Sequence, residues 1–201
     1  MTATKAAKAP TGRQAPTPGR PPAPPARPAR PTASGEPDAK ARATARVRRP
    51  APSEPVLYFA YGSNLDWAQM RRRCPTAAPL GPAALDGWRL AFGGHSRTWG
   101  GSVATIVPSR YERVDGLLYE LPRAELGALD LFEGHPGCYR RRPMPVGVRP
   151  DGQRRLAHTY VLPVVREAPP ALAYFTVLWL AYRALGFDRE PLLAAAAGGV
   201  R

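Results

Sequence analysis

The stretch Val56–Leu65 (VLYFAYGSNL) carries the clearest structural signal in this 201-residue chain. Its first six residues, Val56–Tyr61, form an apolar and aromatic run with the length of a β-strand. The next three, Gly62, Ser63 and Asn64, tolerate tight turns and cap helices. A turn here directs consecutive backbone N–H groups toward the strand end, where they can hold a carboxylate or an oxyanion. We therefore expect a strand, a turn and a binding site in this order.

Upstream of this stretch, residues 1–55 differ in composition from the rest of the chain. They hold 13 of the 26 prolines and 11 of the 29 basic residues, and the first aromatic residue of the chain is Tyr58. Such a segment cannot bury enough apolar surface to offset the entropy lost on ordering, so we expect a disordered tail. Residues 56–201 are enough for one domain with its own core.

The tail contributes +8 to the formal net charge of +14. A basic arm of this kind attracts nucleic acid by neutralising phosphates, although without aromatic side chains it cannot stack on bases. The other interpretation is a solvated extension that has no partner. The sequence leaves both interpretations open, and it leaves the oligomeric state open as well.

The composition excludes several classes of protein. Two cysteines cannot staple a secreted mini-protein, and they cannot complete a structural zinc site by themselves. The sequence contains no run of about 20 apolar residues, which is the length that a membrane-spanning helix needs. The first residues lack the apolar segment of a secretory signal. We therefore expect a cytoplasmic protein that does not insert into a membrane.

Downstream of the turn, strand-like and helix-like segments are mixed without a regular βαβ repeat. This mixture predicts an α+β domain built around one curved sheet. Pro143 and Pro145 imply an edge position or a bulge for the strand that holds them. Strands are expected at Trp88–Phe92, Val103–Val107, Val114–Leu121, Tyr139–Val148 and Leu156–Leu162. Helices are expected at Leu65–Cys74, Arg123–Glu133 and Ala171–Leu185.

Glu133, the last residue of the expected helix Arg123–Glu133, is the acidic candidate for chemistry. At about 100° per residue it projects between Leu126 and Leu129, at the margin of the apolar face. A partly buried carboxyl there, without a neighbouring Lys or Arg in the helix, has a raised pKa and suits a general base. The alternative is an exposed glutamate at a helix C-terminus, where the helix dipole disfavours it.

Several well-known catalytic motifs are absent from the sequence. It has no Walker A loop, no G-x-S-x-G elbow and no H-E-x-x-H pair. The three histidines, His95, His135 and His158, are far apart and include no close metal-binding pair. We therefore expect no metal site.

Four motifs follow one another in the order of the γ-glutamylcyclotransferase, or AIG2-like, family. Leu57–Leu65 (LYFAYGSNL) resembles the family's opening signature. Thr98–Ile106 (TWGGSVATI) and Val114–Tyr119 (VDGLLY) resemble its next two segments. Leu129–Tyr139 (LDLFEGHPGCY) resembles its L-D-x-x-E-G…Y element. The resemblance extends over residues 57–186, which is the whole expected folded part.

This resemblance implies a compact mixed β-barrel with flanking helices and a cavity at the turn. It also implies an enzyme without a cofactor, which cyclises a γ-glutamyl group to 5-oxoproline and releases the amine or amino acid bonded to it. By position, Glu133 would be the catalytic acid and base. The substrate-binding residues would be Tyr58, Phe59, Ala60, Tyr61, Gly62, Ser63 and Tyr174, with Tyr139 and Tyr160 as further candidates.

The residues fit such a small-molecule γ-glutamyl substrate. Its α-ammonium must lose a proton before the nitrogen attacks the γ-carbonyl of the same molecule. Glu133 would take this proton and return it to the departing nitrogen. The leaving amine stays open, and so does the choice between a carboxylate and an oxyanion at the turn. The alternative function is a non-catalytic binding module that recognises a γ-glutamyl-like ligand.

Overall fold

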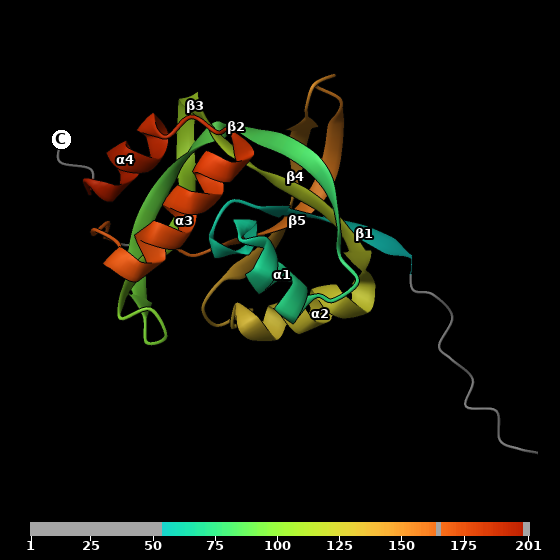
Figure 1. The fold of residues 1–201 in the computed structure, drawn as a ribbon, viewed down its shortest axis with the longest axis horizontal. Coiled ribbons are helices and arrows are strands. Elements are labelled where there is room, and N and C mark those ends of the chain that lie inside the picture. Colours follow the sequence, from blue (N-terminus) through green and yellow to red (C-terminus); the bar gives the residue numbers. More distant parts are fainter. Residues whose placement is uncertain (1–53, 164–165, 199–201) are drawn as a thin grey trace, which may run out of the picture. The chain divides into compact units, whose positions relative to one another are not determined.

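The computed structural model describes residues 54–163 and 166–198. Within them, five strands close into a barrel in the order β1-β3-β2-β4-β5, and helices flank it (Figure 1). The predicted α+β barrel with flanking helices is confirmed. The strands are β1 Pro55–Ala60, β2 Ala78–Ser96, β3 Gly101–Pro122, β4 Arg140–Val148 and β5 Arg154–Val161. The helices are η1 Ser63–Leu65, α1 Trp67–Arg73, α2 Arg123–Phe132, α3 Leu172–Leu185 and α4 Glu190–Ala196.

The predicted disordered tail, residues 1–55, lies outside the described residues except for its last two. Of these two, Pro55 already belongs to β1 and pairs with Pro122 of β3. The folded part therefore begins one residue earlier than expected. None of the helices within 54–163 and 166–198 is long and apolar enough to cross a membrane.

The barrel combines antiparallel and parallel pairing. The pairs β1–β3, β2–β3, β2–β4 and β4–β5 are antiparallel. The barrel closes between β1 and β5, which are parallel and share the single ladder pair Tyr58↔His158. This closure brings the end of β1, and with it the turn at Gly62, beside the residues that follow β5.

The long hairpin β2–β3 corrects the prediction of three short strands. Trp88–Phe92 is the middle of β2, and Val103–Val107 and Val114–Leu121 are two halves of β3. The register passes from Trp88↔Pro108 to Asp86↔Arg113, so four residues of β3 stand against Gly87 alone. Gly87 has a φ of 80°, which lets β2 bend at this bulge. Residues 109–113 therefore form an irregularity within one strand.

Strand β4 confirms the edge position that its prolines predicted. Pro143 and Pro145 pair with His158 and Leu156 of β5. On its other side, β4 pairs with β2 only near its end, through Gly147 and Val148. Within the described part of the chain, the prolines thus have a ladder partner on one side only, and a missing N–H group on the open side costs no ladder hydrogen bond.

The helix ends follow local sequence signals. Asp66 caps α1 by accepting a hydrogen bond of 2.7 Å from the backbone N–H of Gln69. Helix α2 ends at Phe132, one residue before the expected end, and Glu133 is its C-cap with Gly134 at a φ of 63°. Helices α1 and α2 lie beside each other, and α3 and α4 cover a different part of the barrel (Figure 1). Helix α4 was not predicted.

Candidate active site

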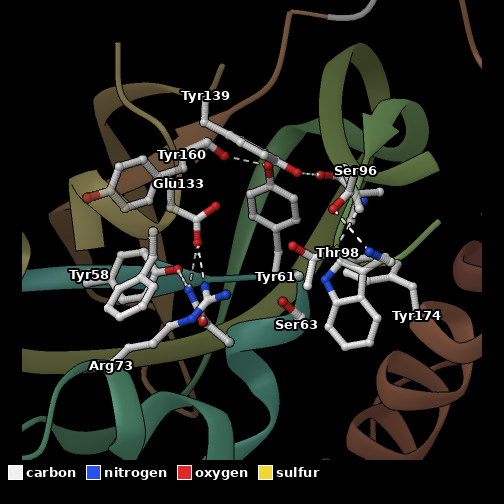
Figure 2. Close-up of a pocket in the computed structure, with 16 residues that line it drawn as sticks. Tyr58, Tyr61, Ser63, Arg73, Ser96, Thr98, Glu133, Tyr139, Tyr160 and Tyr174 are labelled. Carbon is white, nitrogen blue, oxygen red and sulfur yellow. Dashed lines mark hydrogen bonds and ion pairs between the residues drawn. The ribbon is translucent and has the colours of Figure 1, made fainter. Parts of the chain in front are cut away.

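A cavity lies at the end of β1, between the turn, the C-terminus of α2 and the first turn of α3 (Figure 2). The wall is completed by Ser96 at the end of β2 and by Thr98 and Trp99 in the connection to β3. The fold thus gathers residues more than 100 positions apart in the sequence. Eight of the predicted site residues line the cavity: Tyr58, Tyr61, Gly62, Ser63, Glu133, Tyr139, Tyr160 and Tyr174.

Phe59 and Ala60, predicted together with them, do not line the cavity. Side chains alternate along a strand, so Phe59 points to the opposite face of β1 from Tyr58. Its ring lies over Gly116 of β3, where a Cβ would be 2.5 Å from two ring carbons. Phe59 is fully buried and Ala60 is 1 % exposed. Phe59 therefore packs against β3, and Ala60 is buried in the core without lining the cavity.

The Glu133 carboxylate faces the turn and is held by two donors. Its Oε1 accepts a hydrogen bond of 2.9 Å from Nη1 of Arg73 and one of 3.1 Å from Nδ2 of Asn64. Arg73 lies at the end of α1 and Asn64 in η1, so both reach Glu133 from elements outside its own helix. The Glu133 side chain is 14 % exposed. Figure 2 shows this group at the centre of the cavity wall.

Burial and the two donors act in opposite directions on the pKa of Glu133. Burial disfavours the charged carboxylate and raises the pKa, whereas the Arg73 charge and the hydrogen bonds from Arg73 and Asn64 lower it. Burial is the larger effect, so the pKa of Glu133 lies above its ordinary value. A carboxyl with a raised pKa can both take and return a proton near neutral pH.

Sequence reasoning missed Arg73 and Asn64 as site residues. The sequence marks Asn64 only as a turn residue, and its position in the turn was the signal that could have placed it here. Arg73 is one of three consecutive arginines at the end of α1, and it is the packing of α1 against α2 that brings it to Glu133. The expectation of no basic neighbour considered residues of the helix only, and the partner comes from α1.

The tyrosines form most of the wall, and several of their hydroxyls are bonded to the backbone. Tyr61 donates to the carbonyl oxygen of Tyr160. Tyr139 donates to the carbonyl oxygen of Ala104 over 2.8 Å. The Tyr160 hydroxyl points away from Glu133 (Figure 2) and donates to the Asp130 carboxylate over 2.8 Å. Tyr160 therefore presents its ring to the cavity, and its hydroxyl fixes the strand to α2.

The cavity wall carries charges of both signs. Of the described residues that line it, two are charged, Arg73 and Glu133. Across residues 54–163 and 166–198, no group of three or more His, Cys, Asp and Glu side chains is arranged to hold a metal ion. The wall therefore offers one proton acceptor, one cation and a turn of backbone amides.

Comparisons with known proteins agree on one family. The model of the family "Gamma-glutamyl cyclotransferase, AIG2-like" matches residues 58–176. The γ-glutamylcyclotransferase of Homo sapiens is 32% identical over 142 residues, which cover 68% of this chain and 75% of the relative. The γ-glutamylcyclotransferase of Bos taurus is 31% identical over 147 residues, which cover 71% of this chain and 78% of the relative.

A solved structure of a γ-glutamyl cyclotransferase superposes with a TM-score of 0.66 at 29% sequence identity. The match covers 74% of this chain and 90% of that one. The region matched by the family model contains every residue predicted for the site, from Tyr58 to Tyr174. The prediction of an enzyme of this type is confirmed at the level of the family: the chain belongs to the AIG2-like γ-glutamyl cyclotransferases.

Proposed function

We propose that the protein converts a γ-glutamyl amine or γ-glutamyl amino acid into 5-oxoproline and the free amine or amino acid. The observation that carries this proposal is the Glu133 carboxylate, which is buried, faces the turn and has a raised pKa. Membership of the family supports the choice of reaction, because the similar proteins bear the name of this activity.

The proposed reaction needs one proton carrier. Glu133 takes a proton from the α-ammonium of the substrate, and the freed amine attacks the γ-carbonyl carbon. A C–N bond forms and the carbonyl π electrons move to oxygen. When the intermediate collapses, the bond to the leaving nitrogen breaks and Glu133 returns the proton to that nitrogen. The ring nitrogen gives up its second proton, which the released amine takes up as it becomes an ammonium. Attack within one molecule already has a high effective concentration, so the site mainly folds the substrate and moves protons.

The hydrogen bonds of Glu133 assign its two oxygens different tasks. Oε1 is occupied by Arg73 and Asn64. No hydrogen bond from the described residues reaches Oε2, which leaves it free to exchange the proton with the substrate nitrogen. The amides of the turn at Gly62 and Ser63 are then available for the substrate carboxylate or the transient oxyanion.

The replacement Glu133→Gln tests this role. We expect kcat to fall by about 10²–10⁴-fold, because an amide cannot carry the proton. The measurement is release of 5-oxoproline from γ-glutamyl-alanine and γ-glutamyl-lysine. Glu125→Gln is the matched control, because Glu125 lies on the same helix but accepts its hydrogen bonds from Thr76, away from the cavity. This control should keep its activity and thermal stability close to those of the parent.

Two results would contradict the proposal in different ways. Undiminished turnover by a folded Glu133→Gln variant removes Glu133 from its role. Binding of γ-glutamyl compounds by the parent protein without any 5-oxoproline, over a panel of leaving groups, supports the non-catalytic binding module instead.

A further inference from the structure

The tyrosine hydroxyls of the cavity wall are of two kinds. Tyr61, Tyr139 and Tyr160 donate their own protons to carbonyl or carboxylate oxygens. Tyr58 and Tyr174 instead accept an N–H hydrogen bond, and no hydrogen bond among the described residues takes up their protons. These two hydroxyls can therefore donate to a bound substrate without breaking a bond inside the protein.

The surroundings of the Tyr174 oxygen direct its proton into the cavity. The backbone N–H of Ala104 donates to this oxygen over 3.2 Å. Burial raises the pKa of Tyr174 to about 12, and the hydrogen bond from Ala104 acts in the opposite direction. Because this oxygen accepts one hydrogen bond already, its O–H bond points elsewhere, and the accepted bond makes the hydroxyl a stronger donor.

The turn comes very close to this hydroxyl. A Cβ built on Gly62 would lie 3.1 Å from the Tyr174 oxygen. Because Gly62 has no side chain, the backbone of the turn can lie close to the Tyr174 hydroxyl. The Tyr174 O–H and the backbone amides of the turn therefore lie close together at the same end of the cavity.

Tyr58 and Tyr174 serve different ends of the cavity. Asn64 donates from the same Nδ2 to Tyr58 and to Oε1 of Glu133, so Tyr58 lies on the side of the base. Tyr174 lies on the other side, with Tyr61 and Ser63 between the two in Figure 2. The substrate amine must approach Glu133, and its carbonyl oxygen must then point away from the base.

We propose that Tyr174 is a further catalytic residue, whose hydroxyl donates a hydrogen bond to the γ-carbonyl oxygen of the substrate as that oxygen becomes an oxyanion. The inference rests on the proposed function, because it concerns the same reaction. The proton stays on Tyr174: the amine forms its C–N bond, the electron pair moves to the carbonyl oxygen, and Tyr174 stabilises the charge until the leaving nitrogen departs with the proton from Glu133. Such a donor acts mainly in the transition state.

The test compares Tyr174→Phe with Tyr139→Phe. Both variants remove one hydrogen bond to the backbone of Ala104, from its N–H and from its carbonyl respectively, so their structural costs are similar. We expect Tyr174→Phe to lower kcat by about 10²–10³-fold with KM little changed, and Tyr139→Phe to lower kcat by at least an order of magnitude less. Thermal unfolding measured for both variants checks that the two folds are equally retained.

A third variant keeps the test sharp if Tyr174→Phe folds poorly. Difluorotyrosine at position 174 preserves both the shape and the donor, so it should restore kcat to near the parent value. A rise in KM with unchanged kcat for Tyr174→Phe overturns the inference, because it means ground-state binding of the substrate, for example of its carboxylate. Equal losses for Tyr174→Phe and Tyr139→Phe overturn it as well.

The outcome for Glu133 separates this inference from the proposed function. If the parent is active and Glu133→Gln is not, equal activity of the two tyrosine variants refutes the role of Tyr174 alone. If the parent releases no 5-oxoproline from any γ-glutamyl compound, both proposals are wrong.

Discussion

Arg73 illustrates how a single residue tunes the candidate base. Its Nη1 donates to Oε1 of Glu133 and to Oδ1 of Asn64, each over 2.9 Å, and its guanidinium lies 5.1 Å from the ring centre of Phe132. The positive charge favours the ionised form of Glu133, and burial disfavours it. The balance decides at which pH the base is ready to accept a proton.

The replacement Arg73→Gln should therefore change the pH profile. A general base works when it is deprotonated, so kcat/KM rises with pH as Glu133 ionises, and this acidic limb lies above the ordinary pKa of a glutamate. Loss of the Arg73 charge raises the pKa of Glu133 further and moves the limb to higher pH. Activity measured across the acidic range should thus fall more than activity on the plateau.

Arg73→Lys is the control for charge. It keeps a cation beside Glu133, so its acidic limb should lie between those of the parent and Arg73→Gln. If the limb of Arg73→Gln coincides with that of the parent, either Glu133 is not the group that the profile reports, or Arg73 does not act on it.

At the scale of elements, the antiparallel pairing of β1 with β3 depends on a glycine. A Cβ on Gly116 would lie 2.4 Å from the carbonyl oxygen of Ala60 and 2.5 Å from the ring of Phe59. Since a fully buried ring and a backbone oxygen cannot both move away, this position requires the smallest residue. The pairing of β1 with β3 supports the end of β1, and the turn of the site begins there.

Gly116→Ala should lower the free energy of unfolding by about 1–3 kcal/mol, because it overpacks the core. Gly127→Ala provides the opposite control. Gly127 is exposed on α2, and a methyl group at this position would have no atom within 4 Å, so alanine there should stabilise the protein by about 0.5–1 kcal/mol. Urea unfolding measures both changes. A Gly116→Ala variant as stable as the parent would mean that β1 and β3 separate at little cost.

At the scale of the whole molecule, side chains help to close the barrel. The closing strands β1 and β5 share one ladder pair, Tyr58↔His158. Beside it, the buried hydroxyl of Thr159 donates to the carbonyl oxygen of Phe59 over 2.9 Å. On the neighbouring face, Thr105 of β3 donates to the carbonyl oxygen of Leu162 and accepts from its N–H. Both threonines are fully buried.

Thr159→Val should cost about 1–3 kcal/mol of stability, because valine has the same shape but leaves the Phe59 carbonyl without its donor in a buried place. Thr176→Val is matched to it: Thr176 also donates to a backbone carbonyl, that of Leu172, but on the exposed side of α3. Its loss should change stability by less than about 0.5 kcal/mol. Similar effects of the two variants in thermal unfolding would show that the Thr159 bond does not hold the barrel closed.

The sequence by itself determined the features that depend on neighbouring residues. The strand and turn at Val56–Asn64, the start of α2 after Pro122 and the αL glycine at its end all follow from local backbone preferences. The choice of Glu133 came from its place at the margin of the apolar helix face and from the resemblance to the family. The composition of residues 1–55 likewise predicts disorder. The expected disorder and cytoplasmic location stay predictions, and nucleic-acid binding by the tail stays an open alternative.

Only the tertiary structure decided which of the three arginines at the end of α1 reaches Glu133, and that Phe59 turns away from the cavity. It also decided that two short strands join into β3 across a bulge, and which tyrosine hydroxyls keep their protons free. These outcomes depend on contacts between residues far apart in the chain, such as Arg73 with Glu133 and Ala104 with Tyr174. No periodicity or local propensity encodes such contacts, because they exist only after the barrel has closed and its helices have packed.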